Sequence, residues 1–239
     1  MSRYKILTDL HTHTVASTHA FSTVVEMASS AEKNGIKLIA ITDHGPAEQD
    51  SPHIWHFECM SRVPDYINGV RILKGVECNI LNENGDTDYN PKYMSSLQVI
   101  IASVHSPTYV PSGKEEYFTS LKAAAMDEMI SIIGHMSRYG FAMTESDFEP
   151  VLQACIDNNK LVEINSSCLE NELYLKNTRA LVRACKNMSA KVAVNSDAHI
   201  CFEVGDFSAA VSLLEKEHFP QSLIVNSDVE SVLEYFSLR

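Results

Sequence analysis

Residues 97–104 of the chain read LQVIIASV, an almost continuous apolar run that ends one residue before His105. Such a run is typical of a strand that is buried on both faces, and strands of this kind occur in parallel sheets covered by helices. The chain has no apolar run of about eighteen residues, so no transmembrane helix is expected. This stretch therefore predicts the parallel sheet of an α/β fold.

On both sides of this stretch, β-rich segments alternate with helical ones. The predicted strands are residues 4–10, 36–42, 70–80, 97–104, 130–135, 160–165 and 191–197. The predicted helices are residues 23–35, 114–129, 144–159, 173–188 and 207–218. The tail is predicted to add a short strand at 222–227 and a helix at 228–238, and the Asn-Gly pair within residues 82–86 predicts a hairpin turn.

This alternation is the pattern of βαβ units. About seven such units fit the segments, which predicts a closed or nearly closed barrel of the TIM type. No linker rich in Pro, Gly or Ser divides the chain, so a single domain is expected. The least regular stretch, residues 45–69, is long for a βα loop and holds the only tryptophan, Trp55; long loops of this kind are often functional.

Composition excludes some classes of function. The net charge of −12 argues against a nucleic-acid partner, because phosphate backbones are bound by basic patches. The N-terminal sequence MSRYKILTDLH lacks the apolar core of a signal peptide, so a cytoplasmic location is expected. The cysteines are scattered without a C-x-x-C pair and are expected to be buried thiols; they are Cys59, Cys78, Cys155, Cys168, Cys185 and Cys201.

Histidine and acidic residues gather where the predicted strands end. His11 and His13 end the first strand, and similar positions on later strands are held by His44, Glu77, His105, His135, Asp197 and His199. In an α/β barrel the carboxyl ends of the strands meet at one rim, where the active site is built. Chance would not place so many of the ten histidines at this rim. The sequence therefore predicts one shared polar site.

The spacing of these residues supports the same conclusion. Residues i and i+2 of a strand point the same way, so His11 and His13 share a face, and Asp197 and His199 repeat the spacing. Asp9 has the same parity as His11 and His13 and is expected to lie one step deeper on their face.

The residue types indicate metal binding. Imidazole and carboxylate ligands suit zinc and, less exclusively, manganese or iron. The candidates are too many for one ion with four to six ligands. They predict two or three ions, with Glu77 as a natural bridge because a carboxylate offers two oxygens.

The strings DLHTHT, ITDHG, GVECN, VHS, GH and SDAH, together with His19, resemble the PHP superfamily, named for polymerase and histidinol phosphatase. The resemblance covers essentially the whole chain. It is closest to the small stand-alone PHP phosphatases, through HTHTVASTHAFST, GIKLIAITDHGP, PHIWHF and NSDAHI. It implies one metal-dependent hydrolase domain over residues 1–239, built as a distorted (βα)7 TIM-like barrel. It also implies a trinuclear metal centre, commonly zinc, that hydrolyses phosphoesters.

The resemblance also implies a ligand set for each ion. One ion would be held by His11, His13, Glu77 and Asp197, a second by Glu77, His105 and His135, and a third by His19, His44 and His199. One departure from the family pattern is visible. Relatives often have proline after the histidine of the fifth strand, whereas this chain has Met136, which puts the loop shape and the choice of substrate in question.

The expected chemistry is metal-assisted hydrolysis, in which a metal-activated hydroxide attacks phosphorus in line. Asp9 and Asp43 are expected to orient ligands from outside the ligand shell rather than to transfer protons. Arg138 is a candidate phosphate contact because guanidinium matches phosphate geometry. His53 and His56 are candidates for lining the substrate entrance. For these last three residues, a plain surface or packing role is the open alternative.

The leading functional hypothesis is a phosphatase that acts on a small phosphomonoester, with no membrane or nucleic-acid partner. A phosphodiesterase or exonuclease and a histidinol-phosphate phosphatase are alternatives with the same ligand set. A non-catalytic metal-binding module is a further alternative, against which a ligand set with open coordination positions argues. The sequence leaves the oligomeric state open.

Overall fold

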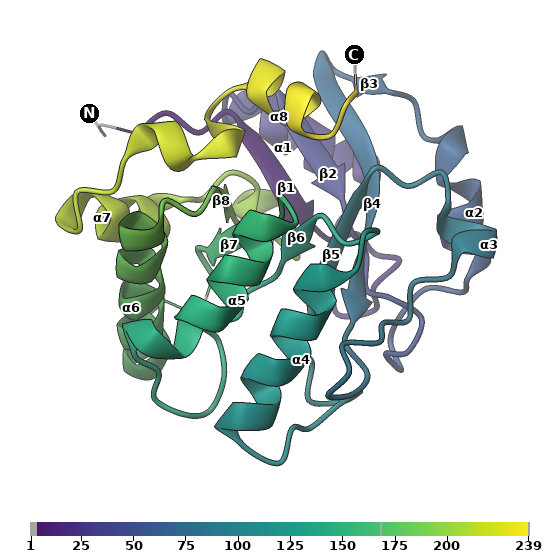
Figure 1. The fold of residues 1–239 in the computed structure, drawn as a ribbon. Helices are drawn as coiled ribbons and strands as arrows, with labels where there is room; N and C mark the ends of the chain where they lie inside the picture. Colours follow the sequence, from purple (N-terminus) through teal and green to yellow (C-terminus); the bar gives the residue numbers. More distant parts are fainter. Residues whose placement is uncertain (1–3, 168, 239) are drawn as a thin grey trace.

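The computed structural model describes residues 4–167 and 169–238. Its centre is a mostly parallel sheet in the order β1-β2-β4-β5-β6-β7-β8, with the short β3 (Tyr66–Ile67) antiparallel to β4. The parallel strands are β1 (Thr8–Thr12), β2 (Leu38–Ile41), β4 (Val70–Asn79), β5 (Val99–Ser103), β6 (Ile132–Ile133), β7 (Leu161–Asn165) and β8 (Val192–Asn195). The predicted nearly closed barrel of parallel strands is confirmed (Figure 1).

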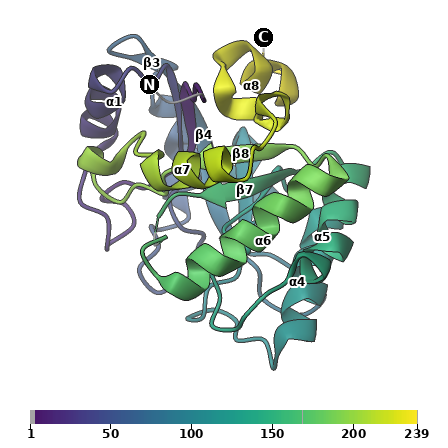
Figure 2. The ribbon, with the colours of Figure 1, turned by 90° about the vertical axis from the view of Figure 1, so that its left-hand side faces the viewer.

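Helices cover the outside of the barrel. Figures 1 and 2 show three long helices lying side by side over β5 to β8; they are α4 (Lys114–Met126), α5 (Glu145–Asp157) and α6 (Glu172–Met188). The other helices are α1 (Val24–Lys33), α2 (Trp55–Glu58), α3 (Pro91–Met94), α7 (Ser208–Lys216) and α8 (Val229–Tyr235). Capping boxes at Thr23 and Thr144 begin α1 and α5, because each threonine side chain satisfies an orphan backbone N–H.

Several predicted boundaries need correction. The first strand begins at Thr8 rather than Tyr4, and residues 222–227 form two 3-10 turns (Gln221–Leu223 and Val225–Ser227) instead of a strand. The loop 45–69 contains α2, a 3-10 turn (Cys59–Arg62) and β3. The turn at residues 82–86 is flanked by an antiparallel bridge between Ile80 and Thr87, which agrees with the predicted hairpin.

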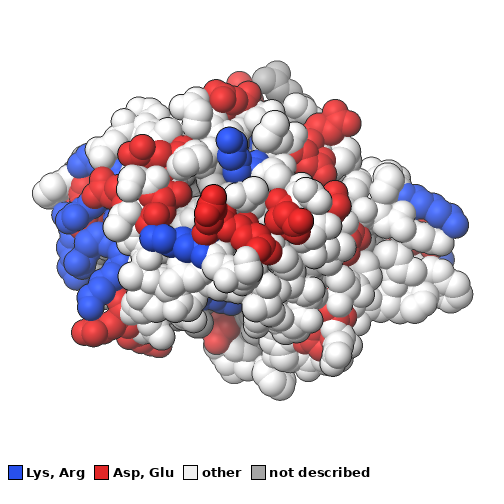
Figure 3. All heavy atoms as spheres, turned by 60° about the horizontal axis from the view of Figure 1, so that its bottom comes forward, with Lys and Arg blue, Asp and Glu red and all other residues white. Residues whose placement is uncertain are grey.

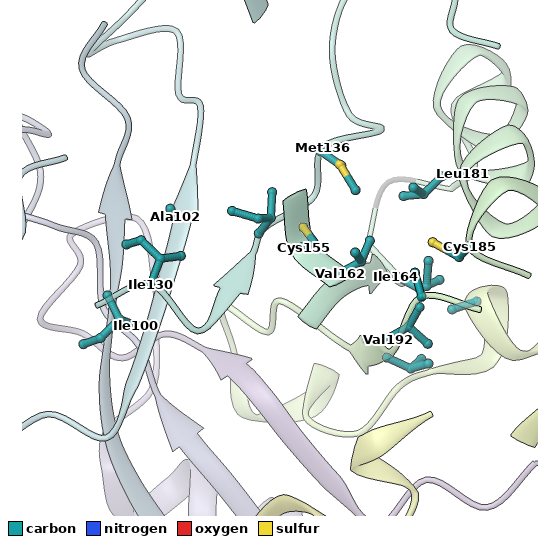
Figure 4. Close-up of a cluster of buried hydrophobic side chains, with 14 of the residues drawn as sticks. Ile100, Ala102, Ile130, Met136, Cys155, Val162, Ile164, Leu181, Cys185 and Val192 are labelled. Carbon is teal, nitrogen blue, oxygen red and sulfur yellow. The ribbon is translucent and has the colours of Figure 1, made fainter. Parts of the chain in front are cut away.

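Two hydrophobic layers hold the barrel together. The interior cluster takes at least one side chain from each parallel strand and is closed at the amino ends of the strands by Val232 and Leu233 of α8. A larger outer cluster lies between the strands and the helices, and Figure 4 shows part of it around Val162, Leu181 and Cys185. The interior cluster stops at the amino half of the barrel, so the carboxyl half is left to polar side chains.

The barrel closes between its first and last strands, β1 and β8, along a seam that side chains bridge in place of a complete ladder of backbone hydrogen bonds. Asn226 lies between β1 and β8 and donates to the carbonyl oxygens of Thr8 (2.9 Å) and Val194 (2.6 Å), while its Oδ1 accepts from the Val194 N–H (2.9 Å). Asn195 continues the seam, because its Oδ1 accepts from the Leu10 N–H at 3.0 Å. The 3-10 turn at Val225–Ser227, in which only Asn226 departs from helical backbone angles, therefore places one amide in the seam where a strand was predicted.

A register shift in β1 changes the direction of its side chains. The pairing of β1 with β2 is irregular between Asp9 and Thr12. Leu10 belongs to the barrel interior, and His11 also faces inward, where its Nδ1 contacts Glu163 of β7. The expectation that Asp9 shares the face of His11 is wrong, because a bulge breaks the period of two. Asp9 instead accepts hydrogen bonds from Ser196 and from the Gly205 N–H.

The cysteines follow the prediction only in part. Cys78, Cys155 and Cys185 are buried thiols, whereas Cys59 is exposed and Cys201 is half-buried because both lie in surface 3-10 turns. Cys168 lies outside the described residues.

Candidate metal centre

The carboxyl ends of the strands place the candidate ligands around Glu77, which lies within the long strand β4. His105 follows β5 and His135 follows β6 after Gly134. A Cβ at Gly134 would lie 2.1 Å from the Ser103 Oγ, so only glycine lets the chain pass this close to β5 on its way to His135. Asp197 follows β8 with a φ of 57°, a left-handed conformation that aspartate tolerates better than most residues.

The first group of ligand atoms surrounds one point inside the rim. The Oε2 of Glu77 lies 3.2 Å from the His11 Nε2 and 3.5 Å from the His13 Nε2. The Oδ1 of Asp197 lies 3.5 Å and 3.2 Å from the same two nitrogens. In a tetrahedral zinc site with bonds of about 2.0–2.1 Å, neighbouring ligand atoms are about 3.3 Å apart. These four carboxylate–imidazole distances lie near that value, and the ligand atoms of His11, His13 and Asp197 all lie within 4.8 Å of one another.

A second group uses the other oxygen of Glu77. Its Oε1 lies 2.8 Å from the His135 Nε2 and 3.3 Å from the His105 Nε2. The two oxygens of one buried carboxylate thus face two separate groups of imidazoles, as the predicted bridge requires.

A third group lies nearer the surface. Ligand atoms of His13, His44 and His199 come within 4.8 Å of one another. His19 is half exposed, and its ring centroid lies 4.9 Å from that of His44 and 4.6 Å from that of His199. Among the described residues, His19 is in none of the groups whose ligand atoms all lie within 4.8 Å. It stacks on the outer side of the third group.

The unpaired polar atoms of the cluster fit bound cations. Of eleven buried side-chain N and O atoms that lack a hydrogen-bond partner in the described chain, eight belong to this cluster. They come from His11, His13, His44, Glu48, Glu77 and His199. Leaving a buried polar atom unpaired costs about 1–3 kcal/mol, so this concentration indicates that ligands other than protein groups complete the site. The donor set of imidazoles and carboxylates is one that zinc accepts.

The charge state of the carboxylates also suits a cation. Burial raises the pKa of Glu77 and Asp197, but the facing imidazoles, His11 first among them, lower the pKa of both carboxyl groups well below the usual range. Burial and the neighbouring His44 lower the pKa of His13 to about 3, so that its ring is neutral. Ionised carboxylates and the neutral ring of His13 are in forms that bind metals, whereas the facing carboxylates raise the pKa of His11 and His44, whose protons a bound cation would displace.

A further set of residues holds the imidazoles in place, and sequence reasoning missed it. The Oε1 of Glu163 lies 2.7 Å from the His11 Nδ1, and Asn79 Oδ1 lies 2.7 Å from the His105 Nδ1. Asp50 contacts the His19 Nδ1. For Glu163, the one signal was an acidic residue that follows two apolar residues in the buried strand LVEIN.

Glu48 is a second acidic residue that the sequence reasoning missed. Its Oε2 lies 3.0 Å from the His44 Nδ1 and 3.9 Å from the His105 Nδ1. With His44 and His105 it forms a fourth group of close ligand atoms. Its spacing of four residues from His44 was the only signal.

Asp9 and Asp43, the two aspartates predicted to orient ligands, form hydrogen bonds outside the groups of ligand atoms. Asp9 binds Ser196, next to Asp197, and its pKa is raised to about 6 by burial. Asp43 accepts from the Thr14 N–H (2.7 Å), from Ser17 Oγ (2.8 Å) and from His56. The contacts of Asp43 with Thr14 and Ser17 hold the loop between β1 and α1.

The remaining loop histidines lie apart from the ligand groups. His56 turns its Nε2 toward Asp43 at 3.1 Å, and His53 packs edge-on against Trp55. Met136 is fully buried in the outer hydrophobic cluster (Figure 4), so its side chain packs between strands and helices.

Arg138 lies at the mouth of the cluster between two cavities. Its Nη1 donates to the Asp197 Oδ2 (2.9 Å) and to the Ser167 Oγ (2.8 Å). A cavity of about 560 Å³ on one side is lined by His19, Ser166, His199 and Glu203, among others. A cavity of about 370 Å³ on the other side is lined by His105, Tyr139 and Tyr174, among others. Arg138 lines both.

The fold and the site define the class of barrel proteins that gather metal ligands at the carboxyl ends of their strands. The chain belongs to the PHP domain family, whose model matches residues 9–167. A probable phosphatase of Caldanaerobacter subterraneus subsp. tengcongensis is 40% identical over 98% of this chain and 92% of its own length. A probable phosphatase of Shewanella loihica is 36% identical over 98% of this chain and 95% of its own length.

Solved structures agree on the fold. The histidinol phosphate phosphatase of Lactococcus lactis, determined with zinc, L-histidinol and phosphate, matches with a TM-score of 0.66 at 19% identity. The match covers 89% of this chain and 94% of that one. None of the helices in the described part of the chain has the length and apolar character needed to cross a membrane.

Proposed function

We propose that the chain is a metal-dependent phosphatase that hydrolyses a small phosphomonoester at a centre of three ions, with residues 1–239 as one hydrolase domain. The observation that carries the proposal is the arrangement around Glu77, whose two oxygens face two groups of imidazoles within 2.8–3.5 Å. The probable phosphatases that are 36% and 40% identical over 98% of this chain support the reaction class.

The ligand groups suggest how three ions would be held. His11, His13, Glu77 and Asp197 would hold the first ion, Glu77, His105 and His135 the second, and His19, His44 and His199 the third. His19 fits this role because Asp50 binds its Nδ1 and leaves its Nε2 available. Zinc is the proposed metal, and manganese or iron would accept the same donors.

When bound, the ions would supply Lewis-acid chemistry that activates water and neutralises phosphate charge. The chain's own residues orient the participants. Glu163 fixes the His11 ring, and Arg138 holds the Asp197 Oδ2 so that the Oδ1 faces the ligand group. The guanidinium of Arg138 also lines both cavities beside the cluster, which places a phosphate-matching group next to the ions.

The surface charge favours a small substrate over a nucleic acid. In the view of the barrel end in Figure 3, acidic side chains are spread over the surface, whereas Lys and Arg gather toward the side on which α6 lies. A nucleic acid needs a row of basic side chains for its phosphates, and the face in Figure 3 does not present such a row. Histidinol phosphate is a second candidate substrate, which the Lactococcus lactis structure favours through its fold and its bound zinc.

The test is a metal count by elemental analysis joined to assays with p-nitrophenyl phosphate and bis-p-nitrophenyl phosphate. We expect two to three ions per chain and turnover of the monoester in preference to the diester. Preference for the diester would favour a phosphodiesterase. Fewer than two ions, with no turnover of either ester after zinc or manganese is supplied, would overturn the proposal.

A further inference from the structure

Asp88 lies at the end of the hairpin that follows β4, and its carboxylate receives three N–H donors. The Oδ1 accepts from the Asn79 N–H at 2.8 Å, and the Oδ2 accepts from the Asn79 Nδ2 at 2.8 Å and from the Ala47 N–H at 2.9 Å. The backbone passes directly over this carboxylate at Gly45, where a Cβ would lie 2.5 Å from the Oδ2. Asp88 is therefore bound at both oxygens and enclosed on one side.

The orientation of Asn79 is decided by these contacts. An asparagine side chain can present either its oxygen or its NH2 group to a neighbour. The Nδ2 of Asn79 faces two acceptors, the Asp88 Oδ2 at 2.8 Å and the Gly45 carbonyl oxygen at 3.2 Å. The amide therefore turns its Oδ1 toward His105.

The orientation of Asn79 in turn sets the tautomer of His105. The Asn79 Oδ1 lies 2.7 Å from the His105 Nδ1, so this nitrogen carries the proton and donates it. The Nε2 is left with its lone pair facing the Oε1 of Glu77 at 3.3 Å. A histidine ligand needs this free lone pair, and the partner of its other nitrogen controls it.

We propose that Asp88 is a positioning residue for the metal ligand His105 and acts through the amide of Asn79. The inference rests on the proposed metal centre and adds a residue that lies two hydrogen bonds away from His105, which with Glu77 and His135 would hold the second ion. The competing explanation is that Asp88 only anchors the hairpin to β4.

The first test is Asp88→Asn, with Asp86→Asn as the matched control. Asp86 is exposed on the same hairpin and contacts Asn82 instead. An amide at position 88 has one acceptor oxygen where the carboxylate has two, so one of the Asn79 donors faces an NH2 group and the Asn79 amide is no longer held firmly with its Oδ1 toward His105. We expect the affinity for one zinc ion per chain to fall about 10–100-fold in Asp88→Asn, measured by competition with a chromophoric chelator, and to be unchanged in Asp86→Asn.

A second measurement does not depend on metal. Long-range 15N–1H spectra of the metal-free protein should show His105 protonated at Nδ1 in the wild type and lose this signature in Asp88→Asn. The His105→Gln variant identifies the signal. An unchanged His105 tautomer in Asp88→Asn would overturn the proposal even if the variant is less stable.

The exchanged pair Asn79→Asp with Asp88→Asn separates positioning from anchoring. In this double variant the carboxylate at position 79 can accept from His105 while the amide at position 88 donates to it. Recovery of part of the lost zinc affinity relative to Asp88→Asn supports positioning, whereas additive losses support mere anchoring and overturn the proposal. A wild-type protein that binds no ion at all contradicts the proposed function as well, but wild-type binding with an unaffected Asp88→Asn overturns only this inference.

Discussion

The Nδ1 of His11 and the Oε1 of Glu163 lie 2.7 Å apart across the barrel, although 152 positions separate the two residues in the chain. Both side chains are fully buried. The carboxylate is held further by the His135 N–H (2.8 Å) and by the Asn195 Nδ2 (2.8 Å). Glu163 therefore links the ends of β1, β6 and β8 and fixes the direction of one ligand ring.

Glu163→Gln tests this link with little change of shape. We expect a 10–100-fold loss of zinc affinity and a similar loss of kcat/KM, because an amide orients and polarises His11 less well than a carboxylate. Zinc affinity by chelator competition and kinetics with p-nitrophenyl phosphate measure the effect. Glu172→Gln, on the exposed start of α6, is the control. Equal zinc affinity in both variants would show that Glu163 has no part in metal binding.

Glu77→Ala removes the carboxylate whose two oxygens face two ligand groups. We expect at least one ion per chain to be lost and phosphatase activity to disappear, because both ions depend on its two oxygens. Elemental analysis after dialysis against dilute zinc gives the count. Glu77→Gln keeps one oxygen and should retain more metal than Glu77→Ala. Full activity in Glu77→Ala is incompatible with the proposed site.

Removal of metal should destabilise the folded chain. A ligand that binds only the folded state at 1,000 times its Kd contributes about 4 kcal/mol. We therefore expect treatment with EDTA to lower the Tm measured by circular dichroism, and zinc to restore it more fully than magnesium, which prefers oxygen ligands. Identical melting curves before and after chelation would contradict a metal centre in the folded protein.

Metal affinity should also fall in acid. The facing carboxylates Glu163 and Glu77 raise the pKa of His11, and Glu48 and Glu77 raise that of His44 to about 10, so both ligand imidazoles must lose a proton to bind zinc and protons compete more strongly as the pH decreases. We expect the zinc Kd measured with a pH-buffered chelator series to rise between pH 8 and pH 5. A pH-independent Kd would mean that other residues hold the metal.

Arg138→Lys separates a phosphate contact from a purely structural one. Lysine keeps the charge but lacks the planar fork that matches phosphate and carboxylate. We expect kcat/KM to fall about tenfold, mainly through KM, since a charged hydrogen bond contributes about 1.5–3 kcal/mol. The control is Arg183→Lys, whose arginine binds Glu217 on the outer surface. If zinc affinity falls but KM does not, Arg138 acts through Asp197 alone.

Asn226→Ala opens the seam between β1 and β8. The substitution leaves the Thr8 carbonyl and both polar backbone groups of Val194 without their present partner. We expect the free energy of unfolding in urea to decrease by about 2–4 kcal/mol. The adjacent Ser227→Ala should change it by less than about 0.5 kcal/mol. Similar values for the two variants would mean that the seam is not closed by Asn226.

The barrel could be predicted because its signals are local. The run at residues 97–104 and the alternation of apolar strands with amphipathic helices follow from burial on one or two faces, which each segment shows by itself. The positions of His105, His135 and Asp197 could be predicted for the same reason. Parallel strands put their carboxyl ends at one rim whatever the details of packing.

The irregular parts of the barrel and the partners of the ligand imidazoles depended on tertiary structure. Two features arise from contacts between segments far apart in the sequence, and no local pattern predicts them. They are the bulge in β1 that separates Asp9 from His11 and the insertion of Asn226 into the seam. The sequence by itself determined the fold class and the residues that gather at the rim. Only the tertiary structure decided which partner faces each imidazole nitrogen, as Glu163 faces His11, because hydrogen-bond direction is set by distances between strands and not by spacing along one of them.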